Sequence, residues 1–141
     1  MDKNVTLTIS GLHIGQDGED NIESKVSAVF FEKNNSKYLL YEEELPDFSE
    51  KIKNRIKFRD KKVEIIRQGL IDTHMVFDEG KEYVTNYSLP IGNFPISIDT
   101  ESVEITEAET EIVIDVSYNL KLDKEQDNKS SIRIKIENRN T

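Results

Sequence analysis

The sequence has no cysteine and no tryptophan among its 141 residues, and only three prolines. Without cysteine the chain forms no disulfide, carries no thiol nucleophile and offers zinc no thiolate ligand. The longest uninterrupted apolar runs, at 28–31 and 38–41, are four residues long. A membrane-spanning helix needs about 20 apolar residues, so we expect no membrane association.

The N-terminus also lacks a basic stretch followed by an apolar one, so we expect no signal peptide and a cytoplasmic location. The chain is 35% hydrophobic and 33% charged, with a net charge of −9. Because the phosphates of nucleic acids select basic partners, this acidic balance argues against nucleic acid binding. The length fits a single domain over residues 1–141.

Strand-forming residues are abundant: Ile and Val together number 26, against 13 for Ala, Leu and Met. Apolar and polar residues alternate over 5–9, 94–98 and 132–136. In the longest such run the apolar positions are Ile112, Ile114, Val116, Tyr118, Leu120 and Leu122. A period of two places one face of each strand in a core and the other in water.

Turn residues at 17–18, 34–36, 60–61, 69, 79–80, 90–92 and 123–129 separate short strands, of which we expect about nine to eleven. A helical turn could open the segment 46–58, but the alternation there favours a strand. Closing the sheet on itself buries the apolar face and removes the sheet edges. We therefore predict an all-β fold, a closed antiparallel meander barrel of about eight to ten strands, with a sandwich as the alternative.

Several short motifs occur in a specific order over more than a hundred residues. They are Val5–Gly11, Asp17-Gly18, Tyr38–Glu43, Arg67–Gly69, Met75–Phe77, Gly80-Lys81, Tyr87–Gly92 and Val116–Leu120. Through these motifs the chain resembles the YwiB-like family, small bacterial proteins of uncharacterised function. The resemblance implies a lipocalin-like (calycin) barrel of eight or more strands, and it implies no established activity.

Arg67 is the most informative single residue. It shares strand parity with Val63 and Ile65, so we expect its side chain to point inward with them. A buried guanidinium requires a carboxylate or several carbonyl groups as partners. Either Glu42 or Glu43, on a nearby strand, is expected to supply one. Two interpretations stay open: a polar anchor inside a ligand cavity, or a structural ion pair closing one end of the barrel.

These observations favour a non-catalytic binding module for a small amphipathic or anionic ligand, without a cofactor. The alternative is an interaction or assembly protein whose barrel is filled by its own side chains, with a homodimer as one form. A packed interior would be built from Phe30, Phe77, Phe94, Ile112 and Ile114. The residues expected at the ligand site are Arg67, Glu42, Glu43, Tyr41, Met75, Tyr87 and Tyr118.

Other candidate sites are weaker. His13 and His74 are the only histidines, too few for a metal centre, and no nucleophile accompanies them, so we expect no enzyme. The residues around Asp17-Gly18 lack the ligand order of a calcium loop and indicate a hairpin turn.

Charge is unevenly distributed along the chain. Five basic residues alternate along 51–59, and seven acidic residues without a basic one lie in 99–115. The basic stripe predicts a solvated strand face paired with acidic neighbours such as Glu42 or Glu64. An anionic partner, or association driven by the charge separation, is the other interpretation.

Overall fold

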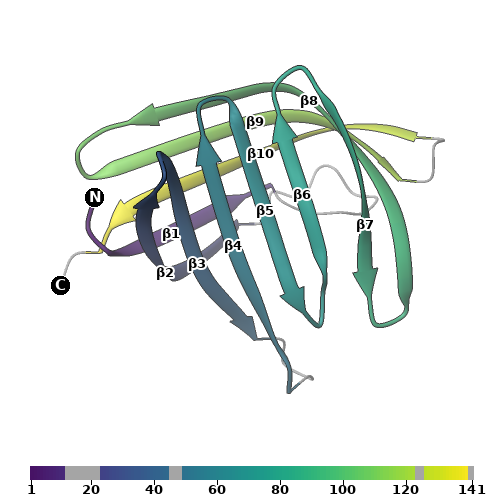
Figure 1. Cartoon of the computed structure of the whole chain (residues 1–141), viewed down its shortest axis with the longest axis horizontal. Helices are drawn as coiled ribbons and strands as arrows, with labels where there is room; N and C mark the ends of the chain where they lie inside the picture. The colour runs from purple at the N-terminus through teal and green to yellow at the C-terminus, as the bar shows by residue number, and fades with distance from the viewer. Residues whose placement is uncertain (12–22, 45–48, 123–125, 140–141) are drawn as a thin grey trace.

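The computed structural model describes residues 1–11, 23–44, 49–122 and 126–139 (Figure 1). These residues form strands and turns, with no helix among them, which confirms the predicted all-β fold. The strands are β1 (Asn4–Ser10), β2 (Glu23–Lys33), β3 (Ser36–Glu44), β4 (Lys51–Arg59), β5 (Lys62–Gly69), β6 (Thr73–Asp78), β7 (Glu82–Leu89), β8 (Gly92–Glu107), β9 (Glu111–Leu122) and β10 (Gln126–Asn138).

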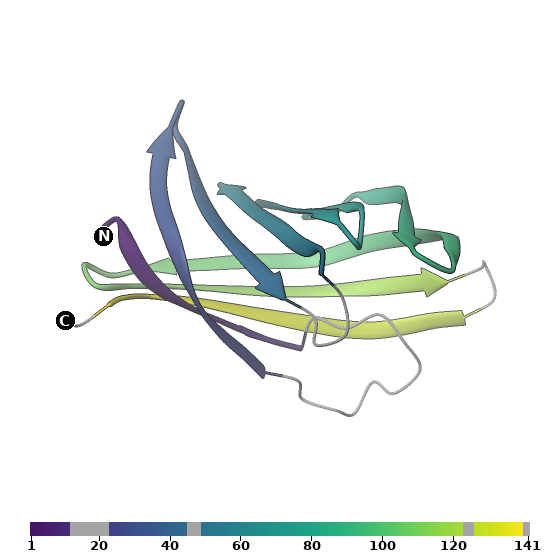
Figure 2. The ribbon, with the colours of Figure 1, turned by 90° about the horizontal axis from the view of Figure 1, so that it is seen from below.

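All ten strands belong to one antiparallel sheet, in which strands that neighbour each other in the chain lie side by side, except β6 and β7. The first and last strands also pair, over Val5 to Ser10 of β1 and Arg133 to Asn138 of β10. The spatial order is therefore β6-β5-β4-β3-β2-β1-β10-β9-β8-β7. Seen from below, β8, β9 and β10 lie side by side along the long axis of the molecule, and β2 and β3 run at a steep angle to them (Figure 2). This confirms the predicted meander barrel.

The barrel closes incompletely between β6 and β7. Near the end of β7, Asp72 and Ser88 exchange two backbone hydrogen bonds of 3.0 and 2.9 Å. Beyond the other end of the gap, the turn after β6 pairs with β8, where the Gly80 amide donates to the Thr100 carbonyl at 2.9 Å. Between these points the described residues form no continuous ladder, so the barrel is nearly closed.

The inward faces of the strands form one apolar cluster that runs around the barrel. The predicted apolar positions of β9 from Ile112 to Leu120 are buried, as are Ile132, Ile134 and Ile136 of β10. Phe30 and Phe77 are buried as expected. Phe94 is 43% exposed, so its assignment to the interior was wrong. It lies only two residues into β8, next to the β7–β8 turn, where the barrel wall ends.

In the segment 46–58, where a helical turn was the alternative, the structure has the strand β4 from Lys51 to Arg59. Its burial pattern alternates, and its basic residues lie on the outer face. The last predicted turn, 123–129, was too long, because β10 already begins at Gln126 and pairs there with Leu122. The expected Asp17-Gly18 turn, His13 and the start of the 46–58 segment lie outside the described residues.

Gly69 ends β5 directly beyond Arg67, at a φ of +124°. A Cβ atom at this position would stand 2.3 Å from the Lys51 carbonyl oxygen, whereas one at Gly80 (φ +80°) would meet nothing within 4 Å. Gly69→Ala should therefore lower the free energy of unfolding by about 3 kcal/mol, and the matched Gly80→Ala by about 1 kcal/mol. Urea unfolding measures both values, and equal losses would contradict this account.

Candidate functional site

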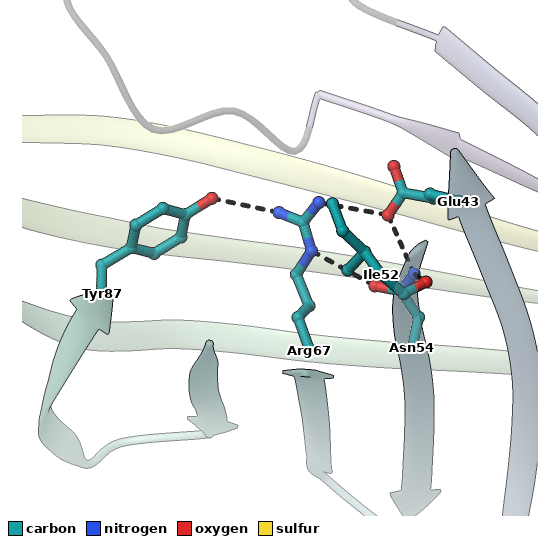
Figure 3. A network of polar contacts seen from close by, with 5 residues as sticks. All are labelled: Glu43, Ile52, Asn54, Arg67 and Tyr87. Atoms are coloured by element: carbon teal, nitrogen blue, oxygen red, sulfur yellow. Dashed lines mark hydrogen bonds and ion pairs between the residues drawn. The ribbon is translucent and has the colours of Figure 1, made fainter. Parts of the chain in front are cut away.

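A polar network lies inside the barrel wall around the guanidinium of Arg67 (Figure 3). Nη2 donates to Oε1 of Glu43 at 3.1 Å, Nε donates to Oδ1 of Asn54 at 3.2 Å, and Nη1 donates to the Tyr87 hydroxyl at 3.1 Å. The Asn54 amide nitrogen donates in turn to the same Glu43 oxygen at 2.9 Å and to the Ile52 carbonyl at 3.3 Å. Side chains from β3, β4, β5 and β7 therefore meet at one cation.

Strand register explains why these side chains meet. Tyr41 of β3 is directly opposite Asn54 of β4, which is directly opposite Arg67 of β5. Directly opposite residues point to the same face of the sheet, so the three side chains form one inward row. Glu43 is two residues beyond Tyr41 and points the same way. The prediction that Arg67 points inward is confirmed.

The network is only partly shielded from water. The Arg67 side chain is 14% exposed and that of Glu43 is 33% exposed, while Asn54 is buried. Tyr41 packs beside the pair, and burial raises the pKa of its hydroxyl well above the ordinary value. The Glu43 carboxylate raises that pKa further, and Arg67 acts in the opposite direction. Tyr41 is therefore a neutral phenol at physiological pH.

The structure brings together four of the predicted site residues: Arg67, Glu43, Tyr87 and Tyr41. Of the two glutamates predicted as partners of Arg67, Glu43 takes the inward position and Glu42 does not. The Glu42 side chain is 53% exposed on the outer face and contacts Lys51 at 3.7 Å.

Two other predicted residues lie in the apolar core. Met75 is buried on the inner face of β6, directly opposite Ile65. Tyr118 packs edge-on against Phe77, with ring centroids 4.9 Å apart. Neither residue is among the hydrogen-bonding or ion-pair partners of Arg67 in the described part of the chain. Both still point into the barrel, so they remain candidates for lining it.

Asn54 is the member of the network that the sequence analysis missed. It occupies an inward position between Ile52 and Ile56, and all three are buried. The signal was present in the sequence, since an amide within an inward apolar series must find hydrogen-bonding partners. Here its carbonyl oxygen accepts from Arg67 and its amide nitrogen donates to Glu43, which fixes both side chains.

Apolar residues lie exposed next to Tyr87. Phe94 is directly opposite Tyr87 in the β7–β8 ladder and is 43% exposed. Ile91, in the turn between these strands, is 85% exposed. The wall that carries one partner of Arg67 thus also presents apolar surface to solvent.

The outer face of β4 bears the basic stripe predicted from the sequence. Lys51 pairs with Glu42 and with Glu44, at 3.7 and 3.4 Å, as expected for a solvated face. Lys57 lies over the ring of Tyr38, which stacks on Phe31 with centroids 4.9 Å apart. Next to them a groove of about 420 Å³ is lined by Ser36, Lys57, Phe58, Arg59, Asp60, Lys61, Lys62, Glu64 and Asp78.

The other charged candidates have structural partners. Glu64 contacts His74 at 3.1 Å. In the acidic segment, Asp115 pairs with Arg133 at 2.7 Å and Glu111 pairs with Lys135 at 3.2 Å. The neighbouring strand β10 therefore offsets part of the charge separation seen in the sequence.

Within the described ranges, no three or more His, Asp or Glu side chains are placed to hold a metal ion. The described residues also form no helix long and apolar enough to cross a membrane. The groups that meet at Arg67 are a guanidinium, a carboxylate, an amide and two phenols, which offer hydrogen bonds and charge.

Comparison with known proteins yields one family and one fold. A family model described as "Domain of unknown function (DUF1934)" matches residues 7–134. The uncharacterized beta-barrel protein YwiB of Bacillus subtilis (strain 168) is 23% identical over 133 residues, covering 94% of this chain and 92% of that protein. The crystal structure of ywiB protein from Bacillus subtilis aligns with a TM-score of 0.81 at 22% identity, covering 98% of this chain and 93% of the other.

Burial of Tyr118 predicts a loss of stability at alkaline pH. Burial raises the pKa of its hydroxyl from 10.0 to about 12, and a hydrogen bond with Ser130 acts in the opposite direction. The folded protein keeps a proton that the unfolded chain releases, so this stabilisation is complete below pH 10 and is lost as the pH rises to about 12.

Over that range the free energy of unfolding should fall more steeply in the native protein than in Tyr118→Phe, by up to about 1.4 kcal/mol per pH unit. Urea unfolding at successive pH values gives both slopes. Tyr41 is present in both proteins, so its contribution cancels. Parallel slopes would show that Tyr118 ionises normally in the folded state.

Proposed function

The chain belongs to the family of the domain of unknown function DUF1934, and we propose that its barrel is a non-catalytic binding module for a small anionic or amphipathic ligand. The family match agrees with the YwiB-like resemblance seen in the sequence. The lipocalin-like (calycin) affiliation stays a prediction, as does action in the cytoplasm without a nucleic acid or membrane partner. The observation that carries the proposal is the partly exposed guanidinium of Arg67.

Hydrogen bonds hold the Arg67 guanidinium in place and leave some of its N–H groups available to a ligand. A guanidinium has five N–H groups, and three of them donate to Glu43, Asn54 and Tyr87. The other two have no acceptor among the described residues. A planar cation fixed in this way suits bidentate recognition of a carboxylate or phosphate.

A role in stability alone gives a weaker account of this residue. Apolar side chains of similar volume stabilise an interior as well as a buried ion pair does, or better, because the pair must first be desolvated. Most of the inward face is apolar and forms one cluster, and its buried polar residues Asn54, Thr73 and Thr100 carry no charge. A charged pair inside it is better explained by a ligand that the pair contacts.

The exposed apolar surface next to Tyr87 supports an amphipathic ligand. Phe94 and Ile91 lie on the wall that also carries Tyr87. A ligand whose charged group contacts Arg67 could lay an apolar part against these side chains. Burying their exposed area would favour binding by about 25 cal/mol for each Å² of apolar surface removed from water.

The alternative is an interaction or assembly protein without a ligand, and the outer face of β4 is the observation in its favour. Phe31, Tyr38 and Lys57 form a continuous stack there. Lys53 and Arg55 are exposed beside it, and no ion pair engages either of them among the described residues. Such a surface suits a partner with acidic and apolar groups, including a second copy of the chain.

Native mass spectrometry of the protein purified from its own host separates the two functions. The binding module should carry a small molecule on each chain. Arg67→Met/Glu43→Gln should lose this molecule, because the polar anchor is gone. Arg133→Met is the matched control, since it removes an exposed arginine paired with Asp115, and it should keep the molecule.

A bound molecule that survives in the Arg67→Met/Glu43→Gln variant would remove Arg67 from the site. Unliganded protein whose mass is that of a dimer would favour the assembly function instead. Circular dichroism on the same samples verifies that each variant is folded.

A further inference from the structure

The charges at the proposed site are balanced, and this restricts the ligand. The Arg67 guanidinium and the Glu43 carboxylate lie 3.1 Å apart, and Asn54 and Tyr87 add no charge. Tyr41 is neutral, because its hydroxyl has a raised pKa. An anion that contacts Arg67 therefore also comes close to Glu43, which repels it, and a cation at Glu43 is repelled by Arg67.

Both members of the pair keep hydrogen-bonding capacity. Oε1 of Glu43 accepts from Arg67 and from Asn54, whereas Oε2 has no hydrogen bond among the described residues. Arg67 has two further N–H groups. The Tyr41 hydroxyl, beside the pair, likewise has no hydrogen bond within the described ranges. The site thus offers a negatively charged hydrogen-bond acceptor, Glu43, next to positively charged hydrogen-bond donors, those of Arg67.

We propose that this site binds a zwitterionic head group, and specifically a free α-amino acid with an apolar side chain. The inference rests on the proposed binding function and specifies its ligand. The ligand carboxylate accepts hydrogen bonds from the two remaining N–H groups of Arg67. Its ammonium group donates to Oε2 of Glu43, beside Tyr41.

The geometry favours a zwitterion over a ligand that carries only a negative or only a positive charge. An α-amino acid carries its ammonium and carboxylate groups on the same carbon atom, and the protein holds the opposite charges of Arg67 and Glu43 close together, so each charge meets its opposite. The ring of Tyr41 adds a favourable surface for an ammonium group. The apolar side chain of the ligand is directed along the wall toward Phe94 and Ile91, which are exposed and adjacent to Tyr87.

Titration of the full chain with three probes, followed by ¹H–¹⁵N NMR, tests this inference. The probes are L-phenylalanine, N-acetyl-L-phenylalanine, which lacks the ammonium group, and L-phenylalaninamide, which lacks the carboxylate. L-phenylalanine should shift the amide signals of β3, β5 and β7. Each of the other two should bind at least tenfold more weakly.

Glu43→Gln gives the sharpest control. This variant keeps the side-chain volume and removes the negative charge, so it should bind N-acetyl-L-phenylalanine more tightly than L-phenylalanine, reversing the native order. Glu111→Gln, on the outer face and paired with Lys135, should leave the native order unchanged. The amide spectra themselves show whether each variant is folded.

The outcomes separate this inference from the function on which it rests. If N-acetyl-L-phenylalanine binds the native protein as tightly as L-phenylalanine, the site binds anions. The proposed binding function then stands, and the proposal of a zwitterionic ligand is overturned. If dodecylphosphocholine binds and L-phenylalanine does not, the head group is zwitterionic but the amino acid is wrong. If no probe binds, the inference is overturned, while a molecule bound to the host-derived protein would still support a binding module.

Discussion

A guanidinium inside a β-barrel must be hydrogen-bonded, and that requirement links four strands of this protein. Arg67 of β5 takes its partners from β3, β4 and β7, so the strands on both sides of the incomplete seam contribute to one network. Asn54 is the central buried member, because it contacts the cation and the carboxylate together. Gly69 allows β5 to end close against the Lys51 carbonyl, directly beyond the arginine.

The network lies where the barrel closes incompletely, between β6 and β7. The first and last strands pair fully, and the ladder is interrupted between β6 and β7, which are consecutive in the chain. Tyr87, on β7, reaches Arg67, on β5, across this interruption. The network therefore joins strands on both sides of the interruption, next to the Asp72–Ser88 bridge.

Strand periodicity predicted much of the architecture, since a period of two assigns each residue to a face. It correctly placed Arg67 with Val63 and Ile65, and it required an inward carboxylate on β3. It could not choose between Glu42 and Glu43, because that choice depends on the register between β3 and β4. The incomplete seam depends on the paths of strands far apart in the sequence, and alternation carries no information about it.

The misplacement of Phe94 and the omission of Asn54 have related causes. Phe94 follows the inward alternation of β8, but the wall ends beside it, and periodicity does not show where a barrel ends. Asn54 also follows an inward alternation, and its polarity was the exception that marked the site. A polar residue in an apolar series is therefore a better sequence marker of this candidate site than the conspicuous charge runs, of which the acidic one is partly neutralised by Arg133 and Lys135.

On the proposed function, Arg67 and Glu43 are kept inside the barrel for binding and are not needed to hold it closed. The most direct test is the free energy of unfolding of Arg67→Met/Glu43→Gln relative to the native protein, both freed of small molecules and measured in urea. Because this variant removes both charges together and leaves neither of them unpaired, we expect a difference within about 1 kcal/mol. A loss of about 3 kcal/mol or more would contradict it and would make the pair a structural closure of the barrel.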